Sequence, residues 1–304
     1  MREAVGFIGL GIMGGAMARN LAARGWDVVG FDISPERRAE AEAAGVTLAT
    51  DVADLGRRAP LIITSLPSPA AVAATAQALA SANLAPRIVA EASTLALEDK
   101  LAFHEVLSGA GHIALDCPLS GTGAQAQTRD LVVYASGDTD AITRMMPVFA
   151  DFSREAHDLG RFGNGTRMKL VANLLVAIHN VASAEAMVLG VKAGLDPDQI
   201  VKLVATGAGN SRIFELRAPM MAADHYEPPT MKVAVWQKDM DVIGRFAAEL
   251  GVETPLFSAS GQVYAAAIAA GLGGLDTAAV CRVIESRSGL DRSITQPDRE
   301  NAIL

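Results

Sequence analysis

The sequence predicts an α/β domain with a doubly wound, mostly parallel sheet, followed by an all-α domain. Up to about residue 160, short β-type runs alternate with longer helical patterns. Most of these runs are continuously apolar, as expected of strands covered on both faces. From Gly165 onward the β-type runs disappear. We therefore expect domains at 1–164 and 165–304, joined by a long interdomain helix over about 166–191.

The elements follow in order along the chain. The expected strands are Ala4–Ile8, Asp27–Phe31, Leu61–Ser65, Arg87–Glu91, Ile113–Asp116 and Leu131–Ala135. A helix over Ile12–Ala23 follows the first strand. After the long helix, further helices are expected at Pro197–Thr206, Arg212–Ala222, Val235–Leu250, Pro255–Ala270 and Asp276–Glu285.

Composition restricts the class of protein. The chain has 304 residues, 50% of them hydrophobic, and a formal net charge of −8 at pH 7. Such a chain can bury two cores and is a poor partner for nucleic acid. Cys117 and Cys281 lie far apart and the histidines are scattered, so neither a disulfide framework nor a metal site is expected. Without a cleavage-type N-terminus or about twenty uninterrupted apolar residues, we expect a cytoplasmic protein that does not enter a membrane.

A glycine-rich turn joins the first expected strand to the first helix. It has the spacing GxGxxG, and Asp32 ends the second expected strand eighteen residues after Gly14. Gly9 turns the chain, Gly11 lets the backbone approach a pyrophosphate, and Gly14 lets the helix pack on the strand. Free N–H groups at the helix start bind phosphate. This Rossmann-type pattern predicts a dinucleotide site with Gly9, Gly11, Ile12, Met13, Gly14 and Asp32.

Asp32 also bears on the choice of cofactor. Its carboxylate would accept hydrogen bonds from the ribose hydroxyls and repel a 2′-phosphate, so NAD(H) is favoured over NADP(H). Arg37 and Arg38 keep NADP(H) open as an alternative, unless they are solvated residues of the next helix. A tight turn in a nucleotide-free α/β domain is the structural alternative for the glycines.

Further motifs follow the glycine turn: TSLP at 64–67, EAST at 91–94, DCPLSG at 116–121 and Lys238-Asp239. Between them stands the run Gly160-x-x-Gly163-x-Gly165-x-x-x-Lys169-x-x-x-Asn173. With GFIGLGIMGGAMARNL at the start, these motifs resemble the β-hydroxyacid dehydrogenase family, the relatives of 3-hydroxyisobutyrate dehydrogenase in the 6-phosphogluconate dehydrogenase superfamily. The resemblance covers nearly the whole chain and implies a hydride transfer between the nicotinamide and a small 3-hydroxy acid or its semialdehyde.

The resemblance also implies roles for single residues. Those expected to face the cofactor from the later loops are Leu66, Pro67, Ser93, Thr94 and Lys238. Those expected to bind the substrate are Ser120, Gly121, Thr122, Asn173 and Lys238, the first three around its carboxylate. Lys169 and Asn173 would form the catalytic pair.

The substrate loop departs from the family pattern. Thr122 stands where the family usually has the second glycine after Ser120. Gln125 and Arg129-Asp130 replace the commoner Gly and Gly-Thr. These changes leave the chemistry in place but do not fix the acid. The segment 207–212 is similar to the branch that acts on polyhydroxylated acids such as threonate.

The lysine in the long apolar helix suggests proton transfer. Lys169 and Asn173 are four residues apart, so they share one face of the helix, and Asn180 falls on that face too. Burial lowers the pKa of a lysine from about 10 towards neutrality. A neutral Lys169 could then take the substrate hydroxyl proton during oxidation, and its ammonium could return it during reduction.

Each of these polar residues has a structural alternative. Lys169 could be a snorkelling surface residue, Ser120 a turn residue, and Lys238 or Arg212 solvated. For Asn180 the preferred interpretation is a hydrogen bond to another helix. The apolar faces of the long helix and of the C-terminal helices favour a homodimer or homotetramer.

Other functions compete with the dehydrogenase. An oxidative decarboxylase of a phosphorylated sugar acid would carry histidine before the asparagine at 173, where this chain has Ala172. An imine reductase of the superfamily normally lacks the lysine. A non-catalytic dinucleotide-binding module would be expected to have lost it.

Overall fold

The computed structural model describes residues 3–290 and divides the chain into two compact units. The first unit is Met1–Val171 and the second begins at Ala172. The division falls inside helix α8 (Asn164–Lys192), whereas we expected the boundary just before this helix.

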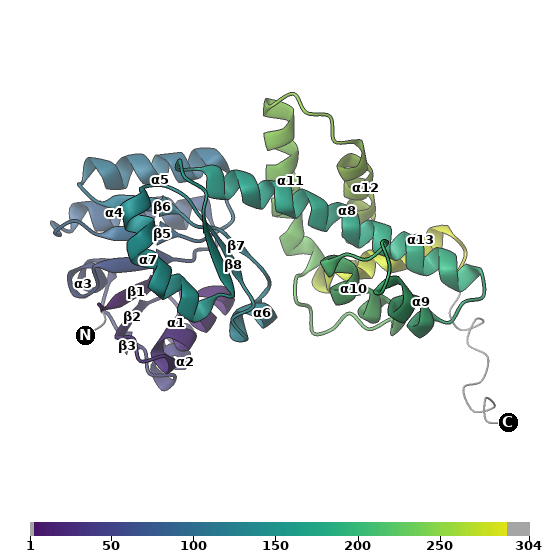
Figure 1. Ribbon diagram of the computed structural model, residues 1–304, viewed down its shortest axis with the longest axis horizontal. Coiled ribbons are helices and arrows are strands. Elements are labelled where there is room, and N and C mark those ends of the chain that lie inside the picture. Colours follow the sequence, from purple (N-terminus) through teal and green to yellow (C-terminus); the bar gives the residue numbers. More distant parts are fainter. Residues whose placement is uncertain (1–2, 291–304) are drawn as a thin grey trace. The chain divides into compact units, whose positions relative to one another are not determined.

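A parallel sheet forms the centre of the first unit (Figure 1). In the described residues it has six strands in the order β3-β2-β1-β4-β5-β6, and every neighbouring pair is parallel. The strands are β1 (Val5–Ile8), β2 (Val28–Phe31), β3 (Thr47–Leu48), β4 (Leu61–Thr64), β5 (Ile88–Glu91) and β6 (Ile113–Asp116). The expected doubly wound α/β fold is confirmed.

Helices cover both faces of this sheet. They are α1 (Ile12–Ala23), α2 (Pro35–Ala43), α3 (Val52–Arg58), α4 (Pro69–Ser81), α5 (Leu97–Gly109) and α7 (Thr139–Phe152). Val5 and Phe7 of β1 pack in one core with α1 and α7, while Ile8 packs in the other with α3, α4 and α5. Alternate residues of one strand therefore enter opposite cores, which is why the strands read as continuous apolar runs.

A second, smaller sheet corrects one expectation. The strand near 131–135 does not join the large sheet: β8 (Val132–Ala135) lies between β7 (Leu119–Ser120) and β9 (Glu155–Asp158). The sequence did not predict β3, β7 or β9. The first two have only two residues each, and β9 is the polar stretch EAHD, in which no side chain is fully buried.

The described part of the second unit is helical. After α8 come α9 (Pro197–Val204), α10 (Arg212–Ala222), α11 (Val233–Glu249), α12 (Pro255–Ala269) and α13 (Val280–Arg287), with short 3-10 helices at Leu272–Gly274 and Thr277–Ala279. Local signals account for the ends: Asp196 and Ser211 cap α9 and α10, and prolines stand in the first turns of α9 and α12. The expected all-α half is confirmed.

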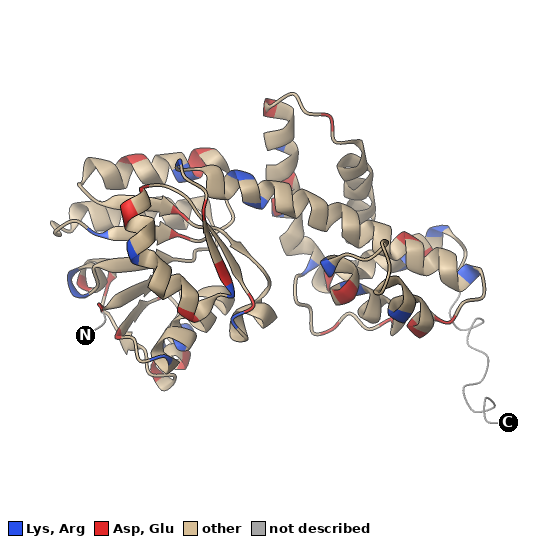
Figure 2. Cartoon of the chain, in the orientation of Figure 1, with Lys and Arg blue, Asp and Glu red and all other residues tan. Residues whose placement is uncertain are grey.

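Helix α8 is long and unusually apolar. Between Lys169 and Glu185 it carries no charged residue (Figure 2). By length and composition alone it could cross a membrane: its most apolar 18-residue window has a mean hydropathy of 1.7, and 44% of that window is buried inside the protein. Asn180 is 1% exposed and donates to the Tyr264 hydroxyl and to the Thr277 carbonyl, both at 2.9 Å. The expected interhelix hydrogen bond of Asn180 is thereby confirmed.

Candidate active site

Close backbone contacts shape the glycine-rich turn between β1 and α1. Gly9 has a φ of +92°, and a Cβ at Gly14 would lie 2.0 Å from the Gly9 carbonyl oxygen. At Gly11 a Cβ would stand in open space, so a ligand can approach the backbone there. Gly11 is also the N-cap of α1 and supplies no side-chain acceptor, which leaves the first N–H groups of the helix available to a phosphate.

Asp32 lies directly after β2 and is tied to this turn. One carboxylate oxygen accepts a hydrogen bond from the Leu10 N–H at 2.6 Å, and the other accepts one from the Ser34 N–H at 2.8 Å. The carboxylate therefore sits beside the turn, where the ribose of a dinucleotide would lie. On α2, the Arg37 guanidinium pairs with Glu40 at 2.8 Å.

The loops that follow β4 and β5 meet at the same edge of the sheet. The Leu66 N–H donates to Ser93 Oγ at 2.8 Å. Parallel strands present their carboxyl ends on one side, and the strand order reverses between β1 and β4, which is where doubly wound folds bind dinucleotides. The predicted cofactor residues at this edge are Gly9, Gly11, Ile12, Met13, Gly14, Asp32, Leu66, Pro67, Ser93 and Thr94.

The predicted substrate loop begins in the small sheet. Ser120 pairs with Val132 across β7 and β8, and Gly121 has a φ of +134°, a region that favours glycine. The Thr122 N–H donates to Gln125 Oε1 at 3.0 Å. We expected this N–H to bind a carboxylate, but here it is engaged within the loop. The Ser120 hydroxyl and the Gly121 N–H are the remaining predicted donors.

The residues that depart from the family pattern brace this loop. Besides bonding Thr122, the Gln125 amide donates to Asp130 Oδ2 at 3.1 Å, and Asp130 pairs with Arg154 at 2.7 Å. Arg129 has a φ of +61°, at the place where the family usually has glycine. A side chain in the left-handed region costs roughly 1 kcal/mol, and the bonds of Gln125 and Asp130 hold the chain on either side of Arg129.

The predicted catalytic pair is held in different units. Lys169 belongs to the first unit and is 8% exposed. Asn173 belongs to the second, where its amide donates to Asp239 Oδ2 at 3.1 Å. Lys238 lies 3.4 Å from Asp239 Oδ1, with 47% of its side chain exposed. The structure thus groups Asn173 with Lys238 through Asp239, a residue to which the sequence assigned no role.

Two further features lie apart from these residues. Among residues 3–290, no group of three or more His, Cys, Asp or Glu side chains is placed to hold a metal ion. A cavity of about 660 Å³ opens between α11 and α12 in the second unit, but none of the predicted site residues lines it.

Comparison with known proteins gives the family. A family model described as the NAD binding domain of 6-phosphogluconate dehydrogenase matches residues 4–160, and one described as NAD-binding of NADP-dependent 3-hydroxyisobutyrate dehydrogenase matches residues 163–284. The L-threonate dehydrogenase of Cupriavidus necator is 32% identical over 288 residues, covering 93% of this chain and 96% of that protein. The chain belongs to the 3-hydroxyisobutyrate dehydrogenase-like family of β-hydroxyacid dehydrogenases.

Other members of this β-hydroxyacid dehydrogenase family match over the same extent. Glyoxylate/succinic semialdehyde reductase 1 of Arabidopsis thaliana is 29% identical, covering 92% of this chain and 98% of its own. The solved structure of Mycobacterium tuberculosis 3-hydroxyisobutyrate dehydrogenase with L-serine is 28% identical, with a TM-score of 0.84 over 93% of this chain and 99% of that chain. Membership makes the protein a dinucleotide-dependent oxidoreductase.

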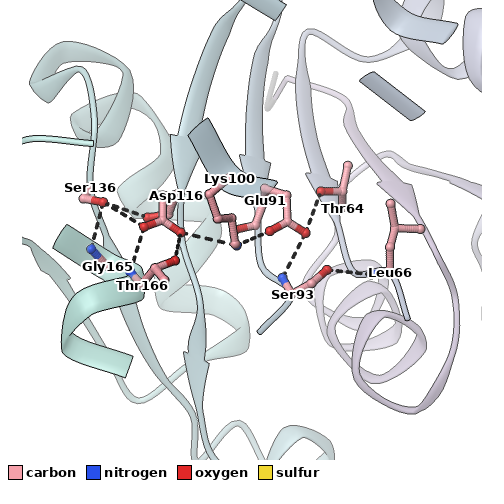
Figure 3. Close-up of polar contacts among 9 residues, drawn as sticks. All are labelled: Thr64, Leu66, Glu91, Ser93, Lys100, Asp116, Ser136, Gly165 and Thr166. Atoms are coloured by element: carbon pink, nitrogen blue, oxygen red, sulfur yellow. Dashed lines mark hydrogen bonds and ion pairs between the residues drawn. The ribbon is translucent and has the colours of Figure 1, made fainter. Parts of the chain in front are cut away.

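Sequence reasoning missed a buried charged cluster in this dehydrogenase. Glu91, Lys100 and Asp116 are fully buried beside the predicted cofactor loops (Figure 3). Glu91 and Asp116 each end a predicted strand, and carboxylates at the carboxyl ends of parallel strands were a usable signal. Lys100 gave no such signal, because a lysine in a partly apolar helix usually points to solvent.

The glycine turn yields a paired prediction. Gly14→Ala should lower the melting temperature, because the added Cβ would stand 2.0 Å from a backbone oxygen, and a helix gain of about 1 kcal/mol cannot offset that clash. Gly11→Ala should keep the wild-type melting temperature but raise the dissociation constant for NADH, measured by fluorescence titration.

Gly109→Ala is the matched control, since Gly109 is exposed and a Cβ there would meet nothing within 4 Å. It should leave the NADH affinity unchanged and should not lower the melting temperature, because alanine favours a helix over glycine. An unchanged NADH affinity in Gly11→Ala would show that the glycine turn is not part of the cofactor site.

Proposed function

We propose that the protein is an NAD-dependent dehydrogenase of a small 3-hydroxy acid, or a reductase of the matching semialdehyde, with Lys169 as its general acid and base. The observation that carries the proposal is the burial of Lys169, which is 8% exposed in the first turns of α8. A buried lysine is shielded from bulk water, and lysine is among the side chains that act as general acid or base. A dehydrogenase uses such a group to move the proton of the substrate hydroxyl.

The residues divide the work as follows. The glycine turn and Asp32 would hold the cofactor, whose nicotinamide would supply the hydride acceptor for oxidation and the hydride donor for reduction. Lys169 Nζ takes the hydroxyl proton in oxidation and gives it back in reduction. Asn173, oriented by its hydrogen bond to Asp239, holds the substrate oxygen. Lys238 adds a positive charge beside the Asp239 carboxylate. The Ser120 hydroxyl and the Gly121 N–H bind the substrate carboxylate.

The relatives support a short carboxylate as substrate. They are named for threonate, for glyoxylate and succinic semialdehyde, and for 3-hydroxyisobutyrate. Each of these compounds carries a carboxylate close to the carbon that is oxidised or reduced. We favour a hydroxylated acid such as threonate or glycerate, because the relative named for threonate is 32% identical and the segment 207–212 is similar to that branch.

A substrate panel and a lysine variant test this proposal. With NAD, at least one of 3-hydroxyisobutyrate, 3-hydroxypropionate, glycerate, threonate and serine should give NADH absorbance. With the best of these, Lys169→Ala should lower kcat about a hundredfold or more, since a positioned general base contributes about that much. Its affinity for NADH should stay near that of the wild type.

Lys202→Ala, which removes an exposed lysine from α9, should leave kcat unchanged. Near-normal turnover by Lys169→Ala would refute the lysine mechanism. Inactivity of the wild type towards the whole panel would refute the substrate class.

NAD(H) is the cofactor that Asp32 favours. We expect kcat/KM with NAD to exceed that with NADP by about tenfold or more, equivalent to about 1.4 kcal/mol. Asp32→Asn should narrow this ratio, because the amide no longer repels a 2′-phosphate. Asp27→Asn, at the exposed opposite end of the same strand, should leave the ratio unchanged. A wild-type preference for NADP would overturn the assignment.

We further propose that the enzyme assembles from two or more copies of this chain. In α8, Leu175 and Leu189 are 47% and 73% exposed and lie fourteen residues apart, on one face of the helix. A second copy would cover such a face. Light scattering at micromolar concentration should give at least twice the monomer mass of 31.6 kDa, and Leu175→Asp should lower it. A monomeric wild type contradicts the proposal.

A further inference from the structure

Two buried carboxylates stand side by side at the edge of the sheet. Glu91 ends β5 and Asp116 ends β6, and the parallel register pairs these two residues directly. Both side chains are 0% exposed. Two like charges on paired buried residues repel in a low-dielectric interior, and a cation in contact with both offsets that repulsion.

Lys100 of α5 supplies that cation (Figure 3). Its ammonium contacts the Glu91 carboxylate closely, lies 3.3 Å from Asp116 Oδ1, and donates to the Glu91 carbonyl at 3.1 Å. Burial acts to lower the pKa of Lys100, but the two carboxylates outweigh it and the pKa is raised above its usual value. The lysine is therefore charged at neutral pH and joins both strand ends.

One side of this cluster reaches the predicted cofactor loops. Glu91 Oε1 accepts hydrogen bonds from the Ser93 N–H at 3.0 Å and from the Thr64 hydroxyl at 3.5 Å. Ser93 Oγ in turn accepts the Leu66 N–H at 2.8 Å. The conformations of both loops thus depend on Glu91.

The other side reaches the start of α8. Asp116 accepts the Thr166 N–H at 2.7 Å and the Thr166 hydroxyl at 2.8 Å, while Ser136 Oγ accepts the Gly165 N–H at 2.9 Å. A Cβ at Gly165 would lie 2.3 Å from the Tyr134 carbonyl oxygen, so the helix start is seated directly on the strand backbone. The Asp116 carboxylate also satisfies the Thr166 N–H, which stands in the first turn and lacks a partner within the helix.

We propose that Glu91, Lys100, Asp116 and Thr166 form a positioning network, which fixes the first turn of α8 relative to the loops at Leu66 and Ser93. Lys169 lies three residues after Thr166, so the network sets where the proposed acid and base stands with respect to the cofactor edge. The inference rests on the proposed function. Buried ion clusters add little net stability compared with apolar packing, which points to geometry as the contribution of this one.

Thr166 offers a test that separates hydrogen bonding from packing. Thr166→Val keeps the shape and a similar helix propensity but loses the hydroxyl, whereas Thr166→Ser keeps the hydroxyl and loses a methyl group. With the best acid from the panel, Thr166→Val should lower kcat about tenfold, as small misplacements of catalytic groups do. It should shift the acid limb of the kcat–pH profile and leave NADH affinity near wild type. Thr166→Ser should stay close to wild type in all three.

A double-mutant cycle tests the link to the cofactor side. Glu91→Gln should raise the dissociation constant for NADH and lower kcat. The double variant Glu91→Gln/Thr166→Val should lower kcat by a smaller factor than the product of the two single-variant factors, because both substitutions disturb one network. Multiplicative effects would show that the two ends act independently and would overturn the link.

The hydrogen-exchange rate reports how stably the first turn of α8 is held, and its measurement needs no catalytic turnover. In the full-length protein, the peptide covering 163–170 should exchange faster in Thr166→Val than in Thr166→Ser. Equal exchange in the two variants overturns the network, and equal kcat and pH profiles overturn its role in placing Lys169. Because this readout does not depend on chemistry, it decides the network even if Lys169→Ala retains turnover and the lysine mechanism fails.

Discussion

Lys100 places a positive charge between two carboxylates that the sheet register cannot separate. Parallel pairing of β5 with β6 puts Glu91 beside Asp116 in the interior, where their repulsion is strong. The Lys100 ammonium offsets that repulsion because it attracts both carboxylates. The loop at Leu66 and the first turn of α8 are hydrogen-bonded to this cluster or to its direct neighbours, so the geometry of both depends on it.

The neighbouring glycine turn is held by a different means. There the constraint is steric: the Gly9 and Gly14 backbones approach too closely for any Cβ, and Asp32 fastens the turn through the Leu10 N–H. The first unit therefore presents one edge built from two kinds of contact, namely close backbone packing near β1 and buried charges near β5 and β6. Both arise where parallel strands end together, which is why ligand sites of this fold gather at that edge.

How far the sequence predicts the fold and the candidate site depends on how far apart in the chain the interacting residues lie. Helices α1 and α10 have the predicted bounds, because glycine turns, serine caps and apolar periodicity are local signals. The partners of Lys100 could not be predicted, since they come from two strand ends that only the folded register aligns. The Thr122–Gln125–Asp130 bonds could not be predicted either: Thr122 was expected to bind the substrate carboxylate, Gln125 and Asp130 stood out only as departures from the family pattern, and their mutual contacts require the loop conformation.

Helix α8 carries both the residue bonded to the buried cluster and the two residues proposed for catalysis. Its first turn is bonded to the strand ends of the first unit through Thr166, and four residues after Lys169 its Asn173 is bonded to Asp239 of the second unit. A helix transmits a displacement of one turn to the next, because each turn is hydrogen-bonded to its neighbour. The spacing of Lys169 and Asn173 along the chain is therefore set by the helix itself. We propose that this spacing serves a proton-transfer group at Lys169 and a substrate-orienting group at Asn173.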